Sequence, residues 1–165
     1  MFFWLDIIAL TQHNSCVMIP SFVDIGSPWR VLPPGIHNAT LEDIKDKFTF
    51  SSRRKRLYQG LCKATTALRK AGCTKIYLDG SFVTEKENPG DYDVCWEETG
   101  VEISKIDPVF LDFEAFRKRQ KERFYGEFFP AHTFADHTYI FLDFFQNDRF
   151  TGEPKGIICI DISNG

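Results

Sequence analysis

Apolar residues recur at helical spacing through the first half of the chain. Between residues 57 and 71 they follow one another at steps of three and four, at Leu57, Leu61, Ala64, Leu68 and Ala71. This spacing predicts a helix with one buried face, which Ser51 or Ser52 caps and Gly72 ends. A shorter helix is expected just before it, because Thr40 is a suitable N-cap with acidic residues after it; this helix should end near Phe48.

Short runs of β-branched and aromatic residues follow and predict strands. Five such runs are expected as strands: residues 75–78, 91–96, 101–106, 138–145 and 157–162. Residues 138–145 have the strongest strand pattern of the chain. A helix over residues 113–124, capped by Asp112, is expected between the strands. The order helix, strand and then Gly80–Ser81 is the feature that bears most directly on function.

Length and composition limit the number of domains. The chain has 165 residues, of which 43% are hydrophobic and seventeen are Phe, enough for one ordinary core. We expect one domain over residues 40–165. Three prolines within residues 27–35 predict an extended lead-in over residues 18–39. Residues 1–17 are expected as an N-terminal extension, either a strand or disordered, because Asp6 interrupts the apolar opening and no basic residue precedes it.

Charge and cysteine usage narrow the classes of partner. The net charge of −3 means that any contact with nucleic acid must come from a local basic patch. Two basic clusters, at residues 53–56 and 117–123, would suit a nucleic-acid acceptor, but the sequence does not place them together. The five cysteines contain no C-x-x-C pair, which fits neither a disulfide framework nor a zinc site and indicates a reducing cytoplasm. The apolar opening is too short to span a bilayer, so no membrane partner is expected.

Asp91 and Asp93 form the first candidate constellation. In a strand, residues i and i+2 point to the same face, so two carboxylates would project into one space. Like charges this close repel, and keeping both ionised at neutral pH needs a cation. Oxygen-only ligands select magnesium or manganese over softer metals. Many such pairs merely end a strand in solvent, so the context of the pair decides its meaning.

That context is a glycine–serine turn nine residues earlier. Gly80 lets the backbone approach a ligand closely, and the Ser81 hydroxyl can bind phosphate oxygens. The linking residues supply a hydroxyl at Thr84 and a cation at Lys86, both suited to the same triphosphate. Each piece alone is typical of a turn or a solvated charge, whereas their joint occurrence indicates a nucleotide site.

Helix, strand, Gly80–Ser81, a short linker and then Asp91-x-Asp93 on the next strand together resemble the polymerase-beta-like nucleotidyltransferase superfamily. The resemblance implies an α/β (α+β) fold, a mixed sheet flanked by helices. It also implies a magnesium- or manganese-dependent site in which a third carboxylate on a neighbouring strand completes a two-metal centre. Asp143 is the candidate for this third ligand, and Asp161 is its main competitor. The exposed face of an edge strand is a nearly equal alternative for Asp143.

A wider likeness covers most of the chain. The segments MIP at 18–20, LPPGIH at 32–37, LDGSFVT at 78–84, FFQ at 144–146 and KGI at 155–157 resemble a family of short bacterial proteins of unknown function that carry this core. This second likeness implies no activity.

The superfamily resemblance implies an enzyme that moves a nucleoside monophosphate from an NTP, with ATP expected, to a protein or RNA hydroxyl. Small stand-alone members are associated with toxin–antitoxin and phage-defence systems, which would add a cognate partner protein. The alternative is a catalytically silent nucleotide-binding or antitoxin-like module. His132 and His137 lie five residues apart without a cysteine partner, so we expect loop or capping roles for them rather than zinc binding.

Overall fold

A computed structural model describes residues 18–164. The expected N-terminal extension, residues 1–17, lies outside the described residues. Ile19, Val31 and Leu32 are buried hydrophobic residues. The lead-in expected over residues 18–39 therefore contributes side chains to the core.

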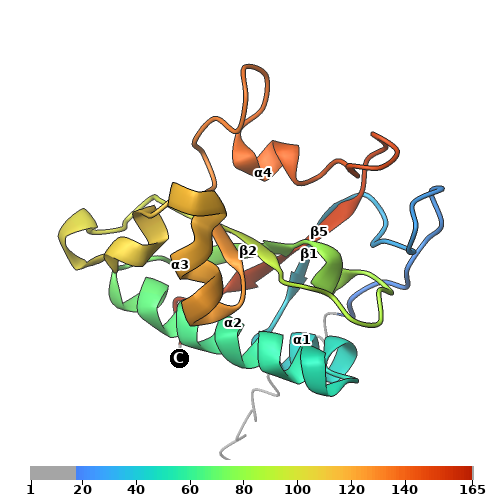
Figure 1. The fold of residues 1–165 in the computed structure, drawn as a ribbon, viewed down its shortest axis with the longest axis horizontal. Coiled ribbons are helices and arrows are strands. Elements are labelled where there is room, and N and C mark those ends of the chain that lie inside the picture. Colours follow the sequence, from blue (N-terminus) through green and yellow to red (C-terminus); the bar gives the residue numbers. More distant parts are fainter. Residues whose placement is uncertain (1–17, 165) are drawn as a thin grey trace, which may run out of the picture.

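The centre of the molecule is a mixed five-stranded sheet with strand order β1-β5-β2-β3-β4 (Figure 1). Its strands are β1 (Gly35–Ala39), β2 (Lys75–Asp79), β3 (Asp93–Trp96), β4 (Glu127–Pro130) and β5 (Gly156–Asp161). β1 pairs with β5 in parallel, and β3 pairs with β4 in parallel. The two pairings of β2, with β3 and with β5, are antiparallel. The fold class is thus α/β (α+β), with a mixed sheet flanked by helices.

Two helices confirm the periodicity of the first half of the chain. Helix α1 (Leu41–Phe48) begins at a capping box, in which the Thr40 hydroxyl accepts from the Asp43 N–H and the Asp43 carboxylate accepts from the Thr40 N–H. Helix α2 (Ser52–Lys70) has Ser51 as its N-cap and places its apolar residues in the core. The chain then turns at Gly72, where φ is +98°.

Two further helices lie in the second half of the chain. Helix α3 (Glu114–Phe124) starts with a left-handed turn at Ala115–Arg117 and contacts α2 and β4. The N-cap of α3 is Phe113 rather than the expected Asp112, whose carboxylate accepts from the Glu114 N–H one residue before the helix cap. Helix α4 (Phe141–Phe144) is a single turn. Short 3₁₀ turns occupy Ser81–Val83, Ile103–Lys105 and Pro108–Leu111.

The sheet has two unlike faces, because side chains alternate along each strand. One face carries Ile76, Leu78, Val94, Trp96 and Phe128, which join the large core with α1 and α2. In Figure 1, α1 and α2 lie below the sheet and α4 lies above it. The face toward α4 has a small apolar cluster of Cys95, Phe129 and Ala131, packed against residues 141–145. This face leaves room for charged residues at one end of the strands.

Two expected strands are absent from the described chain. Residues 138–145 form helix α4 and its approach, because Phe141, Leu142 and Phe145 follow helical rather than alternating spacing and rest together on Phe129. Residues 101–106 hold only the 3₁₀ turn Ile103–Lys105. Conversely, β1 and β4 were not expected. None of the described helices has the length and apolar character that crossing a membrane requires.

Candidate functional site

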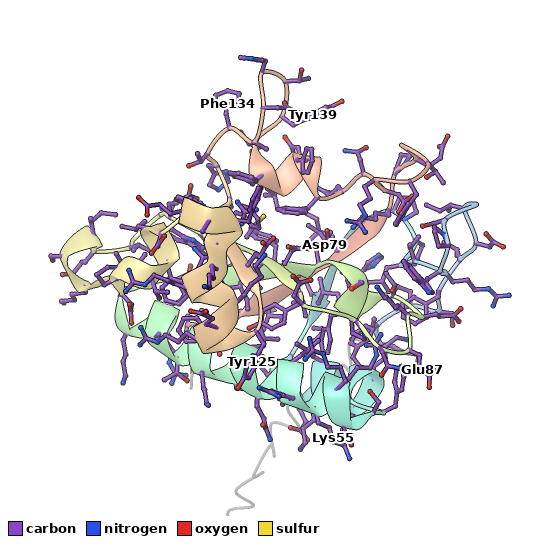
Figure 2. The ribbon with its side chains drawn as sticks, viewed as in Figure 1. Lys55, Asp79, Glu87, Tyr125, Phe134 and Tyr139 are labelled. Carbon is purple, nitrogen blue, oxygen red and sulfur yellow. The ribbon has the colours of Figure 1, made fainter. Side chains whose placement is uncertain are left out.

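A row of three carboxylates crosses the face of the sheet that carries α4. Asp79 is the last residue of β2 and stands opposite Asp93, the first residue of β3. Asp93 in turn stands beside Glu127, the first residue of β4. Side chains at paired positions point to the same face, so the three carboxylates are neighbours although 34 residues separate Asp93 from Glu127. Figure 2 marks Asp79 at the centre of the molecule.

Gly80 makes a close contact that fixes the turn against this row. Its φ is +84°, a backbone conformation that favours glycine. A Cβ atom at this position would lie 2.6 Å from Asp93 Oδ2 and 3.0 Å from the Asp93 backbone nitrogen. The Gly80–Ser81 turn is therefore packed directly on Asp93. Only a residue without a side chain at position 80 allows this close approach.

Two arginines of α2 hold the loop that follows this turn. The buried Arg54 guanidinium donates to the carbonyls of Phe82 (2.7 Å) and Thr84 (2.9 Å), and also to that of Lys86. Burial lowers the pKa of Arg54 to about 10, so it is still a cation at neutral pH. Arg53 donates to the carbonyls at positions 89 and 90, just before Asp91. The start of α2 thereby sets the path of the whole segment between the turn and Asp91.

Asp93 is the central carboxylate of the row, and Asp91 lies two residues before β3. The described residues supply no ion-pair partner that fully compensates the negative charge of these two residues. Burial raises the pKa of Asp93 well above its usual range, and the negative charges of Asp79, Asp91 and Glu127 raise it further. Burial and the charge of Glu127 also raise the pKa of Asp91. Among residues 18–164, neither Asp91 nor Asp93 forms an ion pair. A cation bound by these two carboxylates would offset their mutual repulsion.

The two flanking carboxylates have protein cations as partners. The Lys155 ammonium pairs with the buried Asp79 carboxylate, and this pairing offsets part of the burial that raises the pKa of Asp79. Glu127 Oε1 lies 2.8 Å from Lys121 Nζ and 3.4 Å from Arg117 Nε. Glu127 would have to release these cations to bind a metal ion. The oxygen-only set Asp91, Asp93 and Glu127 has the donor chemistry that magnesium prefers.

The predicted phosphate ligands surround the turn. The Thr84 hydroxyl donates to the Ser81 carbonyl at 2.7 Å and accepts from the Lys86 N–H, so it stabilises the turn from within. Ser81, the residue after Gly80, is partly exposed. The Lys86 ammonium lies over the ring of Trp29, and its charge offsets part of the burial that raises the pKa of Asp91.

Asp143 and Asp161 lie elsewhere. Asp143 is exposed on helix α4. The hydrogen bond with Glu97 is the main cause of the raised pKa of His132, and the charge of Asp143 makes a smaller contribution. Asp161 pairs with Lys75 at the start of β2, four residues or about 13 Å along the strand from Asp79. Asp143 therefore has no strand position, and Asp161 lies on β5 but at the opposite end of β2 from Asp79. Glu127 has the position on a neighbouring strand beside Asp93, and sequence reasoning missed it.

A second group of ligand atoms lies at the other end of β3. Among the described residues, Glu97, Glu98 and His132 are the three whose possible ligand atoms come within 4.8 Å of one another. His132 Nε2 is 3.1 Å from Glu97, and the Glu98 carboxylate accepts from the His132 N–H. From the sequence, His132 was considered only together with His137. Its actual neighbours, Glu97 and Glu98, are brought to it by the parallel pairing of β3 and β4, which the sequence does not show.

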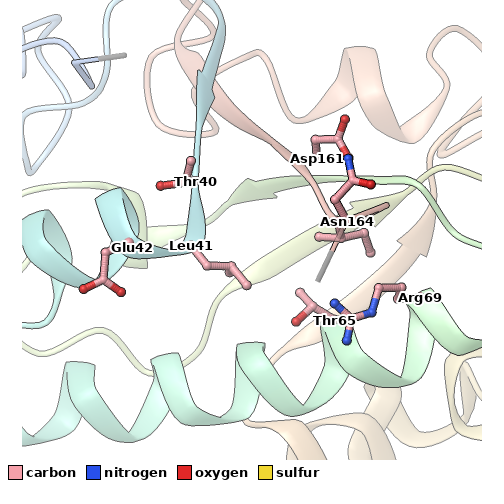
Figure 3. A pocket seen from close by; sticks show the side chains of 8 residues that line it. Thr40, Leu41, Glu42, Thr65, Arg69, Asp161 and Asn164 are labelled. Atoms are coloured by element: carbon pink, nitrogen blue, oxygen red, sulfur yellow. The ribbon is translucent and has the colours of Figure 1, made fainter. Parts of the chain in front are cut away.

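A pocket of about 300 Å³ lies apart from the carboxylate row (Figure 3). Thr65 and Arg69 of α2 line one side, and Asp161 and Asn164 line another. It contains no residue of the Gly80–Ser81 turn or of the row.

Comparisons with known proteins give a family without an activity. No curated protein and no solved structure matches the chain. Residues 27–161 match the model of a family of unknown function, DUF6932. This match spans β1 to β5 and includes every residue of the carboxylate row. The chain therefore belongs to DUF6932, a family of unknown function.

Proposed function

We propose that this protein transfers a nucleoside monophosphate from a nucleoside triphosphate, ATP first among them, to a hydroxyl group of a protein or RNA acceptor. One observation carries the proposal. The Gly80–Ser81 turn is packed against Asp93 so closely that a Cβ atom at Gly80 would lie 2.6 Å from its carboxylate. A turn suited to phosphate oxygens and a carboxylate pair suited to a divalent cation thus adjoin each other.

Asp91 and Asp93 are the residues that would hold magnesium or manganese, with Glu127 as the third carboxylate in place of Asp143. When bound, the metal would favour deprotonation of the acceptor hydroxyl and offset the charge on the pyrophosphate. Burial and then the neighbouring negative charges raise the pKa of Asp93, which fits this role because a divalent cation offsets the repulsion between the carboxylates.

The chain's own residues bind and orient the triphosphate. The Ser81 hydroxyl and the Lys86 ammonium bind the β- and γ-phosphates, while Thr84 and Arg54 keep the turn in shape. The acceptor oxygen forms a bond to the α-phosphorus, and the bond from that phosphorus to the bridging oxygen breaks. Pyrophosphate leaves with that electron pair, and the hydroxyl proton is released. We place this reaction in a reducing cytoplasm, in keeping with the free thiols Cys62, Cys73, Cys95 and Cys159.

The test is a labelling experiment with ATP that is radioactive at either the α- or the γ-phosphate. The purified full chain is incubated with magnesium, with the label, and with total protein or total RNA. Nucleotide transfer predicts an acceptor labelled from α-labelled ATP and not from γ-labelled ATP. Labelling from the γ-position alone would identify a kinase and contradict the proposal.

Single substitutions assign the third carboxylate. Glu127→Gln should reduce labelling as strongly as Asp93→Asn, because both stand in the row. Asp143→Asn and Asp161→Asn are matched controls with exposed carboxylates and should label normally. Loss of labelling in Asp143→Asn with normal labelling in Glu127→Gln would restore Asp143 as the ligand.

One observation favours a second candidate. Lys121 and Arg117 form ion pairs with the Glu127 carboxylate. Of the proposed metal ligands, only Asp91 and Asp93 then have no ion-pair partner among the described residues. A protein arranged in this way could bind a nucleotide without turning it over, for example as an antitoxin-like partner in a toxin–antitoxin or phage-defence pair. Calorimetry with magnesium and ATP, followed by a pyrophosphate assay, separates the two: binding without pyrophosphate release, even with a cognate partner protein present, identifies the silent module.

A further inference from the structure

Three segments that are far apart in the sequence meet around Trp29, beside the Gly80–Ser81 turn. The Lys86 ammonium lies 4.5 Å from the centre of the Trp29 ring. The Phe150 ring approaches it edge-on, with the two ring centres 6.1 Å apart and an angle of 70° between the planes. Trp29 is only partly buried and belongs to neither hydrophobic cluster of the fold, while Phe150 is 51% exposed. These aromatic rings are therefore not needed to fill the core.

Hydrogen bonds tie this aromatic pair to the candidate site. The Glu85 N–H donates to the Arg30 carbonyl at 3.1 Å, which joins the Trp29 segment to the loop after Ser81. The buried Asp148 accepts from the Ser27 hydroxyl (3.1 Å) and from the N–H groups at positions 150 and 151. The charge of Asp148 also raises the pKa of Asp79 after the larger effect of burial. Asp148 thus joins the Phe150 loop to the Trp29 segment.

Lys86 interacts with both the Trp29 ring and the charge of Asp91. Its ammonium covers the Trp29 ring, and its charge offsets part of the burial that raises the pKa of Asp91. A cation over an exposed ring is held weakly, whereas a stacked base is held more firmly and a lysine is drawn to phosphate oxygens. A ligand that carries both a planar base and a polyphosphate would satisfy the ring and the ammonium together.

We infer that Trp29 is the stacking platform for the base of the nucleotide, and that Lys86 leaves the ring for the triphosphate when the base arrives. The inference rests on the proposed function, which supplies the nucleotide. The strength of stacking depends on the area of the base and not on its hydrogen-bonding groups. Purine nucleotides therefore bind more tightly than pyrimidine nucleotides, and ATP and GTP bind about equally. Phe150 supports the Trp29 ring from its edge.

The intrinsic fluorescence of the parent protein tests the inference directly. The chain has three tryptophans, Trp4, Trp29 and Trp96, and Trp96 is buried in the core. With excitation beyond the adenine band, magnesium-ATP should quench the emission of Trp29. Magnesium-tripolyphosphate, which has the phosphates but no base, should bind without this quenching. Trp29→Phe should remove most of the ATP-induced change.

Affinity provides a second measurement. Trp29→Leu should weaken magnesium-ATP about tenfold in calorimetry and leave tripolyphosphate unchanged, because only the stacking partner is lost. Arg30→Gln is the matched control, since it alters an exposed neighbour of Trp29 and should bind ATP as the parent does. The emission of Trp96 reports whether each variant is folded.

Two results would overturn the inference. Equal quenching of the parent by ATP and tripolyphosphate would mean that no base reaches Trp29, and this result needs no variant. Parent-like ATP affinity in folded Trp29→Leu would have the same meaning, and in both cases nucleotide transfer could still be measured. A parent protein that binds neither ATP nor tripolyphosphate would contradict the proposed function together with the inference.

Discussion

The two faces of the sheet use the same strands for different purposes. Toward α1 and α2, the strands present Leu78, Val94 and Phe128, each without exposed surface. Toward α4, the adjacent positions are Asp79, Asp93 and Glu127, three carboxylates in one row. One residue along each strand separates an apolar contact from a charge. The alternation of a strand therefore lets one face supply stability while the other is free to hold like charges that do not stabilise the fold.

The closest matched pair for this comparison is Phe128 and Phe129, neighbours on opposite faces. Phe128 packs against the rings of Tyr92, Phe110 and Phe124, and Phe128→Ala should cost about 3–5 kcal/mol. Phe129 meets residues 141–145, which lie outside the sheet ladder and can settle into the space, so Phe129→Ala should cost about half as much. Urea unfolding of both variants measures the difference. Equal costs would mean that the α4 face is as firmly packed as the helical face.

Lys155→Met tests how strongly the charged face depends on its own cations. The substitution leaves the buried Asp79 carboxylate without its partner and should cost about 3 kcal/mol at neutral pH. Without Lys155 the pKa of Asp79 rises further. The protonated Asp79 carboxyl group then contributes its full stability only below about pH 4. This stability is lost as the pH rises through the pKa that Asp79 has in the folded state.

The deficit of Lys155→Met should therefore shrink toward acid pH, which urea unfolding at several pH values will measure. Asp79→Asn combined with Lys155→Met should recover most of the loss. A deficit that is the same at every pH would show that packing of the lysine stem, rather than charge, is responsible.

Gly80→Ala should cost about 1–3 kcal/mol and abolish nucleotide binding. The new Cβ atom would meet the Asp93 carboxylate at 2.6 Å, and the left-handed φ of +84° is unfavourable for alanine. Gly90→Ala in the same loop is the control, because a Cβ atom there has open space. Thermal melts and ATP calorimetry measure both variants. A Gly80→Ala protein that binds ATP normally would remove the turn from the site.

The smallest effect is expected at the other end of β3. The hydrogen bond with Glu97 raises the pKa of His132, so this pair adds stability fully below about pH 6.5 and loses it as the pH rises through the folded-state pKa. His132→Gln should cost less than about 1 kcal/mol near pH 6, because the side chain is 49% exposed, and nothing near pH 9. Urea unfolding at these two pH values is the measurement. A larger loss at pH 9 would contradict the ion pair.

The faces also differ in how far the sequence could predict them. Helices α1 and α2 and strands β2, β3 and β5 have local signals, namely caps and apolar periodicity, and were predicted close to their observed positions. Strand β1 was missed because its residues Gly35–Ala39 include Gly, His and Asn, and because its partner β5 lies more than 110 residues away. Residues 138–145 were predicted as a strand from their aromatic content, but their apolar positions follow a helical period.

The site divides in the same way. The Gly80–Ser81 turn and Asp93 are close in sequence, and the structure brings them into contact. Glu127 could not be identified, because its place in the row depends on the register between β3 and β4. A signal was nevertheless present. Glu127 opens an apolar run after a helix, just as Asp93 opens Val94–Trp96.

The measurement that tests the central claim most directly is a thermal shift series on the parent and on Asp91→Asn/Asp93→Asn. Without metal, the double variant should melt roughly 2–4 °C higher, because burial and then the neighbouring negative charges, which together raise the pKa of Asp93, disfavour the ionised carboxylate that the substitution removes. Magnesium-ATP at about 100 times its Kd should raise the parent by roughly 5–10 °C and shift the double variant far less. An equal shift of both proteins by magnesium-ATP would place the metal and nucleotide elsewhere and contradict the account.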